Sequence, residues 1–197
     1  MSRRVSRAEA WDLLTDWVES ASLRRHCLAV SASMAAYASK LGEDVEQWEV
    51  TGLLHDMDYE KHPDMDDAEA GHPRTAMKVL TEMDVDPAVV RAIASHADYM
   101  GVSRDSALEK TLAAVDELSG FVVAVAAIRP TGVHGLTPKS VKKKLKTPAF
   151  AAAVSREEIH ANAEALGVDF DEHLRTVIAA IEARADELDL NGSEAAA

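Results

Sequence analysis

Apolar residues recur at helical spacing along almost the whole chain. Between Ser22 and Leu41 they form one stripe, and Gly42 follows it as a residue suited to the left-handed conformation of a helix C-terminus. The segment 105–128 repeats this spacing, and no alternating pattern typical of a strand persists for more than a few residues. With only 9 glycines and 6 prolines in 197 residues, the sequence predicts an all-α protein.

Capping side chains and N-terminal prolines mark where several helices begin. The pairs that carry these signals are Ser6 with Glu9, Asp86 with Pro87, Thr137 with Pro138, Ser155 with Glu158, and Asp169 with Glu172. No internal repeat or linker interrupts the order, so we expect one domain. Its expected parts are an N-terminal helix (1–21), a core (22–128), C-terminal helices that complete the domain (129–190) and a frayed tail (191–197).

Imidazole and carboxylate side chains fall on or beside the apolar stripes of several predicted helices. His55 and Asp56 are adjacent, and His26 shares the stripe that ends at Leu41. Burying such groups is costly unless something pairs with them. A helical bundle can use N and O ligands from different helices to build a metal centre in its core. The candidate ligands are His26, His55, Asp56, His72, His96 and Asp116.

These residues resemble the H…HD…D pattern of the HD-domain superfamily of metal-dependent phosphohydrolases. In this chain the pattern consists of His26, His55-Asp56 and Asp116. The resemblance extends from about His26 to the last predicted helix, and it implies a single-domain HD-fold bundle with a metal centre in its core. The segments most similar to small HD hydrolases of bacteria and archaea are 52–61, 114–120 and 140–146.

The number of ligands bears on how many divalent ions the centre could hold. The four residues of the H…HD…D pattern would hold one ion and leave positions open for water and substrate. Adding His72 and His96 gives a set that suits two ions bridged by Asp56, and HD families with a second histidine pair hold such binuclear centres. We therefore favour two ions over one. Their N and O donors suit Mn, Fe, Ni, Co or Zn, and Mg is a further candidate.

The resemblance implies a hydrolase that uses metal-activated water. We expect it to act on a phosphomonoester or phosphoanhydride of a small molecule, with a nucleotide as the substrate class by family analogy. Two alternatives stay open. Some HD-fold proteins are di-iron oxygenases, and others are non-catalytic sensors that bind a nucleotide or a metal. Iron with oxygen-dependent turnover would favour the oxygenase, whereas an intact ligand set argues against the sensor.

Two groups of residues are candidates for catalysis or for binding the substrate. Asp56 is the expected catalytic carboxylate, and Lys61, five residues later, is a candidate phosphate contact. Phosphoryl transfer depends mainly on positioning and on cations near the phosphate. In the segment 138–146, three lysines could bind the same anion, or they could simply form a solvated helix face. These are Lys142, Lys143 and Lys146, with Lys139 on the same face.

Other reactive side chains are expected to have ordinary structural or surface roles. Cys27 should be a small buried hydrophobe. The histidines outside the pattern should be solvated. So should three carboxylates that could otherwise orient ligands. The histidines are His62, His134, His160 and His173, and the carboxylates are Asp58, Glu60 and Glu117.

The formal net charge of −13 argues against nucleic acid as a partner, because the phosphate backbone would be repelled. No apolar stretch is long enough to span a bilayer, and the basic N-terminus opens onto an amphipathic segment, so we expect neither a membrane partner nor a signal peptide. The single cysteine fits the reducing cytoplasm. We therefore expect a cytoplasmic monomer or homodimer whose partner is a small phosphorylated substrate.

Overall fold

A computed structural model describes residues 2–193, and within this range it contains nine α-helices, one short 3₁₀ helix and no β-strand. The predicted all-α fold is confirmed. The helices are α1 (Arg7–Trp17), α2 (Ala21–Leu41), α3 (Val45–Leu54), α4 (Arg74–Glu82), α5 (Pro87–His96), the 3₁₀ helix η1 (Asp98–Met100), α6 (Ala107–Ala127), α7 (Pro138–Leu145), α8 (Arg156–Leu166) and α9 (Phe170–Glu182).

Local capping explains most helix boundaries. The Ser6–Glu9 capping box is present at α1, and Gly42 ends α2 in the left-handed conformation at φ 75°. Asp86 caps α5, with proline at the first helical position. At α8, the Ser155 side chain accepts the Glu158 N–H. These contacts satisfy backbone groups that a helix end would otherwise leave without a partner.

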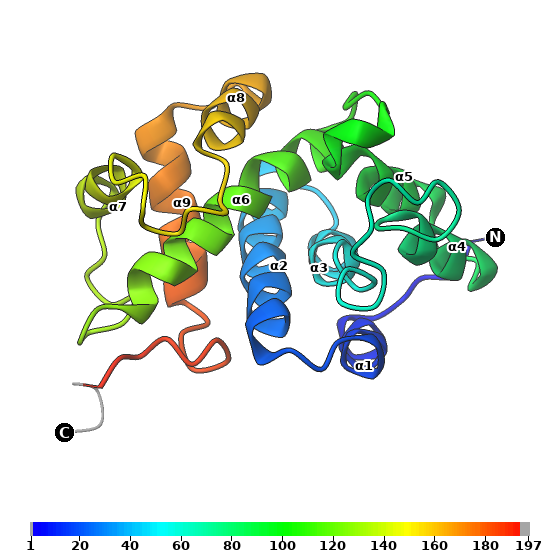
Figure 1. Cartoon of the computed structure of the whole chain (residues 1–197), viewed down its shortest axis with the longest axis horizontal. Coiled ribbons are helices and arrows are strands. Elements are labelled where there is room, and N and C mark those ends of the chain that lie inside the picture. Colours follow the sequence, from blue (N-terminus) through cyan, green and yellow to red (C-terminus); the bar gives the residue numbers. More distant parts are fainter. Residues whose placement is uncertain (1, 194–197) are drawn as a thin grey trace.

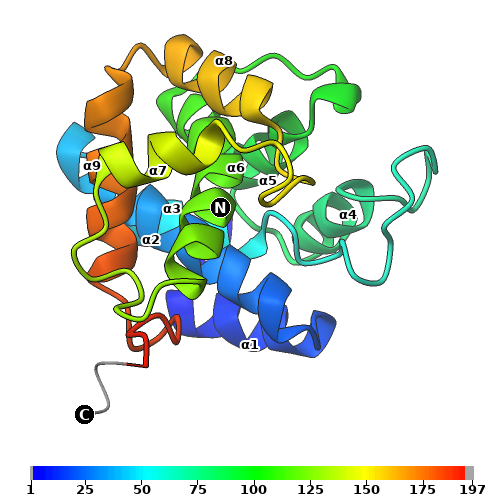
Figure 2. The same ribbon diagram turned by 60° about the vertical axis from the view of Figure 1, so that its left-hand side comes forward.

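The two longest helices, α2 and α6, lie in the middle of the molecule and contact each other. In Figure 1, α1, α3, α4 and α5 lie on one side of them and α7, α8 and α9 on the other. Figure 2, turned by 60°, shows α7 next to α9, and α9 contacts both α2 and α6. One continuous set of buried apolar residues joins the two sides, including Leu53, Phe121 and Val177. The C-terminal helices therefore share the core that α2 and α6 form.

The absence of a side chain at Gly52 allows α2 and α3 to pack closely. A Cβ atom at this position would lie 2.7 Å from the Ser31 Cα atom, which is too close for any other residue without backbone movement. The close approach brings the last turn of α3 against the first half of α2. As a consequence, the residues that follow α3 lie beside the N-terminal turns of α2.

His173 is not the surface residue that we expected. It is buried in α9, where its Nε2 donates to the Ala114 carbonyl oxygen (3.0 Å) and its Nδ1 accepts from the Tyr37 hydroxyl (2.5 Å). Burial lowers the pKa of His173 and favours the neutral ring that these bonds require. His134 and His160 are exposed, as predicted.

The end of the chain is only partly described. Asn191, placed in the predicted frayed tail, donates to Asp186 (2.6 Å) and contacts His134 Nε2 (2.9 Å). Residues 194–197 of that tail lie outside the described residues. Among the described helices, none has both the length and the apolar character that crossing a membrane would demand.

Candidate metal centre

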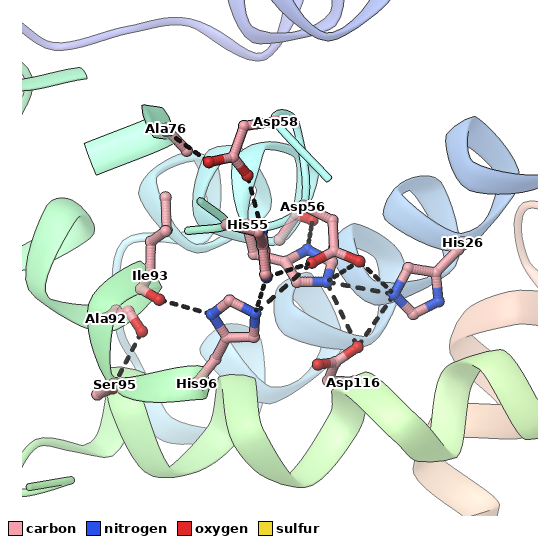
Figure 3. A network of polar contacts seen from close by, with 12 residues as sticks. His26, His55, Asp56, Asp58, Ala76, Ala92, Ile93, Ser95, His96 and Asp116 are labelled. Atoms are coloured by element: carbon pink, nitrogen blue, oxygen red, sulfur yellow. Dashed lines mark hydrogen bonds and ion pairs between the residues drawn. The ribbon is translucent and has the colours of Figure 1, made fainter. Parts of the chain in front are cut away.

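The structure brings all six predicted ligand residues together in the core, although they come from five parts of the chain. Figure 3 labels five of them, all but His72. α2 supplies His26, the turn after α3 supplies His55 and Asp56, and α6 supplies Asp116. His72 lies just before α4, and His96 is the last residue of α5. The helical stripes identified in the sequence therefore converge on one cluster of imidazoles and carboxylates.

One half of the cluster is built around His26 and His55. Their Nε2 atoms lie 3.2 Å apart. The Oδ1 atom of Asp116 lies 3.0 Å from His26 Nε2 and 3.4 Å from His55 Nε2. The Oδ2 atom of Asp56 is 3.6 Å from both Nε2 atoms. His26, His55 and Asp56 each offer one donor atom, and these atoms all lie within 4.8 Å of one another, close enough to hold one metal ion. Asp116 lies beside this group through its contacts with both histidines.

The other half consists of His72, His96 and the second oxygen of Asp56. The Nε2 atoms of the two histidines lie 3.3 Å apart. The Oδ1 atom of Asp56 lies 3.3 Å from His72 Nε2 and 3.5 Å from His96 Nε2. Asp56 thus stands between two histidine pairs and turns a different oxygen toward each.

Hydrogen bonds to the far side of the rings determine which nitrogen faces the cluster. His55 Nδ1 donates to the Gly52 carbonyl oxygen (2.8 Å), and His96 Nδ1 donates to that of Ile93 (2.5 Å). Because these Nδ1 atoms carry hydrogen, the neutral rings turn Nε2 lone pairs toward the other acceptors of the cluster. Facing lone pairs repel unless a proton or a metal cation lies between them. The donor set therefore fits a divalent ion at each histidine pair.

The electrostatics of the cluster also favour positive charge. Burial by itself would lower the pKa of His55, but the carboxylates of Asp56 and Asp116 outweigh it and raise that pKa to about 9. Burial would raise the pKa of Asp116, yet His55 and His26 hold it well below its ordinary value. A cation placed among these groups would compensate the same carboxylates that stabilise the protonated imidazole.

Solvent reaches the cluster unevenly, and Asp56, between its two halves, is 16% exposed. The His55 side chain is fully buried, and those of His72 and His96 are almost so, at 4% and 5% exposed. The side chains of His26 and Asp116 are 22% and 19% exposed. The cluster is therefore most open to solvent beside His26 and Asp116.

Asp58 is hydrogen-bonded to a candidate ligand, which corrects our expectation of a solvated carboxylate. It is fully buried, and its Oδ1 accepts a hydrogen bond from His72 Nδ1 (2.7 Å). Its Oδ2 accepts from the backbone N–H of Ala76 in the first turn of α4 (2.8 Å). The Tyr99 hydroxyl, which the sequence did not single out, donates to the His72 carbonyl oxygen (2.5 Å).

Lys61 is directed toward the C-terminal end of α1. Its Nζ donates to the Asp16 carbonyl oxygen (3.1 Å) and lies 5.0 Å from the centre of the Trp17 ring. A phosphate contact by Lys61 stays a prediction, and it would require the side chain to leave these partners. His62 is half-buried, with its ring 6.2 Å from that of Trp17, so it is less solvated than expected.

The other carboxylates and Cys27 have structural contacts. Glu60 is exposed, as expected, but accepts hydrogen bonds from the N–H groups of Glu19 and Ser20 (3.1 and 3.0 Å). Glu117 is half-buried rather than exposed and accepts from the Ser155 N–H (2.8 Å). Cys27 is fully buried, as predicted, and burial raises the pKa of its thiol.

The basic helix α7 packs against α9 and α6. Lys142 forms an ion pair with Asp171 (2.6 Å), whereas Lys139, Lys143 and Lys146 are exposed. Lys142 and Lys146 also line a cavity with Arg156 and Phe170 at the α7–α8–α9 corner. No residue of α2, α5 or α6, the helices that carry candidate ligands, lines that cavity. A role of these lysines in substrate binding stays a prediction.

Comparison with protein families yields a match. Residues 23–120 match the family model described as HD domain. The matched range begins before His26 and ends after Asp116, so it contains every residue of the cluster. Searches of curated proteins and of solved structures find no match.

Proposed function

The chain belongs to the HD-domain superfamily, and from this membership we propose that it is a metal-dependent phosphohydrolase of small phosphorylated molecules. One observation carries the proposal: two groups of imidazole nitrogens share the carboxylate of Asp56, with one oxygen facing each group. Two cations bridged by a carboxylate are a common arrangement for displacement at phosphorus.

We assign the first ion to His26, His55, Asp56 and Asp116, and the second to Asp56, His72 and His96. This division follows from the distances that the histidine Nε2 atoms make to one another and to the carboxylates, which stay within 3.6 Å inside each half. It uses only N and O donors, the set that suits Mn, Fe, Co, Ni or Zn, and Mg to a lesser extent. Asp56 is the residue on which both sites depend.

When bound, divalent ions lower the pKa of coordinated water and neutralise phosphoryl oxygens. The chain's own residues provide the positions. The Nδ1–H groups of His55 and His96 donate hydrogen bonds to backbone carbonyl oxygens, so both rings direct Nε2 toward the cluster. Asp58 holds His72 in the same way. The buried rear of the cluster excludes bulk water, and the side near His26 and Asp116 admits the phosphate.

We propose that the substrate is a small molecule, with a nucleotide as the expected class, and not a nucleic acid. A chain with net charge −13 repels a long polyanion, whereas a single phosphate can be compensated locally by the ions. Because Lys61 is engaged by Asp16 and Trp17, most of that compensation falls to the metal centre.

The experiment is metal reconstitution followed by a phosphate-release assay. Protein stripped with a chelator is loaded separately with Mn²⁺, Co²⁺, Ni²⁺, Zn²⁺, Fe²⁺ or Mg²⁺, and phosphate is measured across a nucleotide panel. We expect release with at least one metal, and none from Asp56→Ala, whose metal-free fold should persist because the helices keep their apolar faces. Substantial release by Asp56→Ala in excess Mn²⁺ would contradict the proposal.

The donor set also favours a second candidate, because the same nitrogen-rich, carboxylate-bridged arrangement suits two iron ions in an oxygenase. Running the assay under nitrogen separates the two functions. Phosphate release without oxygen supports the hydrolase, and oxygen-dependent turnover with iron supports the oxygenase. Stoichiometric metal binding without any turnover would indicate a sensor.

A further inference from the structure

A groove lies beside the candidate metal centre, next to the start of α2. It is lined by Ser20, Ser22, Leu23, Tyr59, Glu60 and Pro63, and its volume is about 370 Å³. We call it the Tyr59 groove. Two of its lining residues connect it to the centre. The Tyr59 ring packs edge-on against the His72 ring at 5.3 Å, and Leu23 lies one helical turn before His26. No candidate ligand lines the groove, but Tyr59 and Leu23 place it next to residues of the centre.

The floor of the groove is held in place by the connection between α1 and α2. Glu60 accepts hydrogen bonds from the backbone N–H groups of Glu19 and Ser20. The next residue, Lys61, bonds to the Asp16 carbonyl oxygen. These contacts fix the backbone on the C-terminal side of Tyr59, so its ring has a defined position although it is 38% exposed. Because the ring is already ordered, little side-chain entropy is lost when a planar group packs on it.

The charges around the groove restrict what it can bind. No lysine or arginine is among its lining residues, and Glu60 contributes a carboxylate. A second phosphate or another anion would be repelled there, while an uncharged ring could contact Leu23, Tyr59 and Pro63. The exposed hydroxyl of Ser22 could hydrogen-bond to such a ring. The groove thus complements the centre, which would take the charged end of the same molecule.

We propose that the Tyr59 groove binds the uncharged planar part of a phosphate monoester, and that Tyr59 determines this specificity. The inference rests on the proposed function and narrows its substrate class to monoesters of ring-bearing alcohols, nucleoside monophosphates among them. Esters with further phosphates, such as nucleoside triphosphates, are disfavoured because the groove offers Glu60 and no basic side chain to a second anion.

The first test fills the groove without touching the centre. Ser22→Trp adds a large side chain at the second residue of α2, and Ala88→Trp adds the same side chain at the second residue of α5, where Ala88 is exposed. We expect Ser22→Trp to lower kcat/KM for adenosine monophosphate by about tenfold or more, the range of one base–aromatic stack. For acetyl phosphate, which has no ring, it should change kcat/KM by less than about twofold, and Ala88→Trp should change neither value. An equal loss for both substrates, or no loss, would overturn the groove assignment.

The second test examines the ring itself. Tyr59→Phe keeps the planar surface and should retain the preference for adenosine monophosphate over acetyl phosphate, whereas Tyr59→Ala should reduce it, mainly through KM. Metal content is measured in parallel, because Tyr59 contacts His72. A preference for adenosine monophosphate that is unchanged in Tyr59→Ala at normal metal content would contradict the role of Tyr59.

A binding measurement separates failure of this inference from failure of the proposed function. Adenosine, which has no phosphate to release, is titrated into wild type and Ser22→Trp and followed by NMR. Binding to wild type that is lost in Ser22→Trp supports the groove even if no phosphatase activity is found. Phosphatase activity with adenosine binding that is absent, or equal in both proteins, leaves the proposed function standing and overturns the groove.

Discussion

Asp58 holds His72 from a buried position two residues after Asp56. Its two oxygens have different partners, because Oδ1 accepts from the His72 ring at 2.7 Å and Oδ2 accepts from the Ala76 backbone at 2.8 Å. One carboxylate therefore orients a proposed ligand and also caps the start of α4. This double role allows the effects on metal affinity and on stability to be measured separately.

The first prediction is that Asp58→Asn weakens metal binding more than it weakens the fold. An asparagine oxygen can still accept one hydrogen bond, but it lacks the charge that strengthens the His72 bond. We expect a loss of about 10–100-fold in metal affinity, which is typical when a residue that hydrogen-bonds to a metal ligand is replaced. Competition with a chromogenic chelator measures this loss. Asp58→Ala should also destabilise the metal-free protein by about 1–3 kcal/mol, since it leaves the Ala76 N–H buried without its partner. Equal metal affinity in wild type and Asp58→Asn would show that His72 does not bind metal.

The role of Asp58 could not have been predicted from its sequence neighbourhood. It lies in a segment rich in Asp and Glu, and its burial arises only when α4 packs above the turn after α3. The direction of Lys61 depends in the same way on α1, whose position no local pattern specifies. His173 did carry a signal, because it lies three residues after Phe170 and four before Val177, on the apolar face of α9.

Features set by local chemistry were predictable. Gly42 ends α2 and Asp86 with Pro87 begins α5, as expected, because capping involves only nearby residues. The convergence of the six candidate ligands is not set by local chemistry; it was expected from the resemblance to the HD-domain pattern, together with the core faces on which His26 and His96 lie. The Tyr59 groove was not predictable, because it arises between the start of α2 and a turn that follows α3.

The second prediction concerns the number of metal ions. His96→Ala removes a donor from the second half of the cluster and leaves the first half intact. We expect bound metal to fall from about two ions per chain to about one, with activity nearly abolished, because both ions act on the phosphate. The matched control is His134→Ala, an exposed histidine outside the cluster. Elemental analysis after gel filtration gives the stoichiometry. If His96→Ala retains the wild-type metal content, the centre holds one ion, and His72 and His96 serve the substrate or the fold.

The third prediction concerns the pH dependence of stability through Glu109, which forms a capping box with Ser106 at the start of α6. Burial by itself would raise the pKa of Glu109, but the N–H groups of Ser106 and Asp105 and the charge of Arg91 more than offset it and lower that pKa. A carboxyl with a lowered folded-state pKa adds stability above its unfolded value, about 4.3, and this stability is lost as pH falls through the folded value. Glu109→Gln should therefore cost about 1 kcal/mol at pH 7, and the difference from wild type should shrink as pH falls below about 4.

Urea unfolding of the two metal-free proteins, from pH 7 down to pH 3, measures this difference. Glu157→Gln, at an exposed carboxylate in the first turn of α8, controls for the loss of one charge near a helix N-terminus. A difference between wild type and Glu109→Gln that stays constant down to pH 3 would mean that the charge of Glu109 contributes no stability.

The last prediction concerns the basic helix α7. A substrate with a phosphate is repelled by a chain of net charge −13 over distances near the Debye length, about 8–10 Å at physiological salt. Lysines that project from α7 would offset this repulsion and increase the rate of encounter. Lys143 and Lys146 are the residues to change, because they are exposed, whereas Lys142 is paired with Asp171 and its reversal would also disturb the contact with α9.

We expect Lys143→Glu with Lys146→Glu to lower kcat/KM several-fold at low salt, while kcat changes little, because steering affects encounter rather than the chemical step. The loss should decrease as salt rises, since screening weakens the attraction and the repulsion alike. The control reverses Lys78 and Lys110, two lysines outside α7, and so produces the same change in net charge. If both double variants lower kcat/KM equally, net charge alone is responsible. If neither does, α7 is a solvated helix face, and the phosphate is held by the metal centre without help from these lysines.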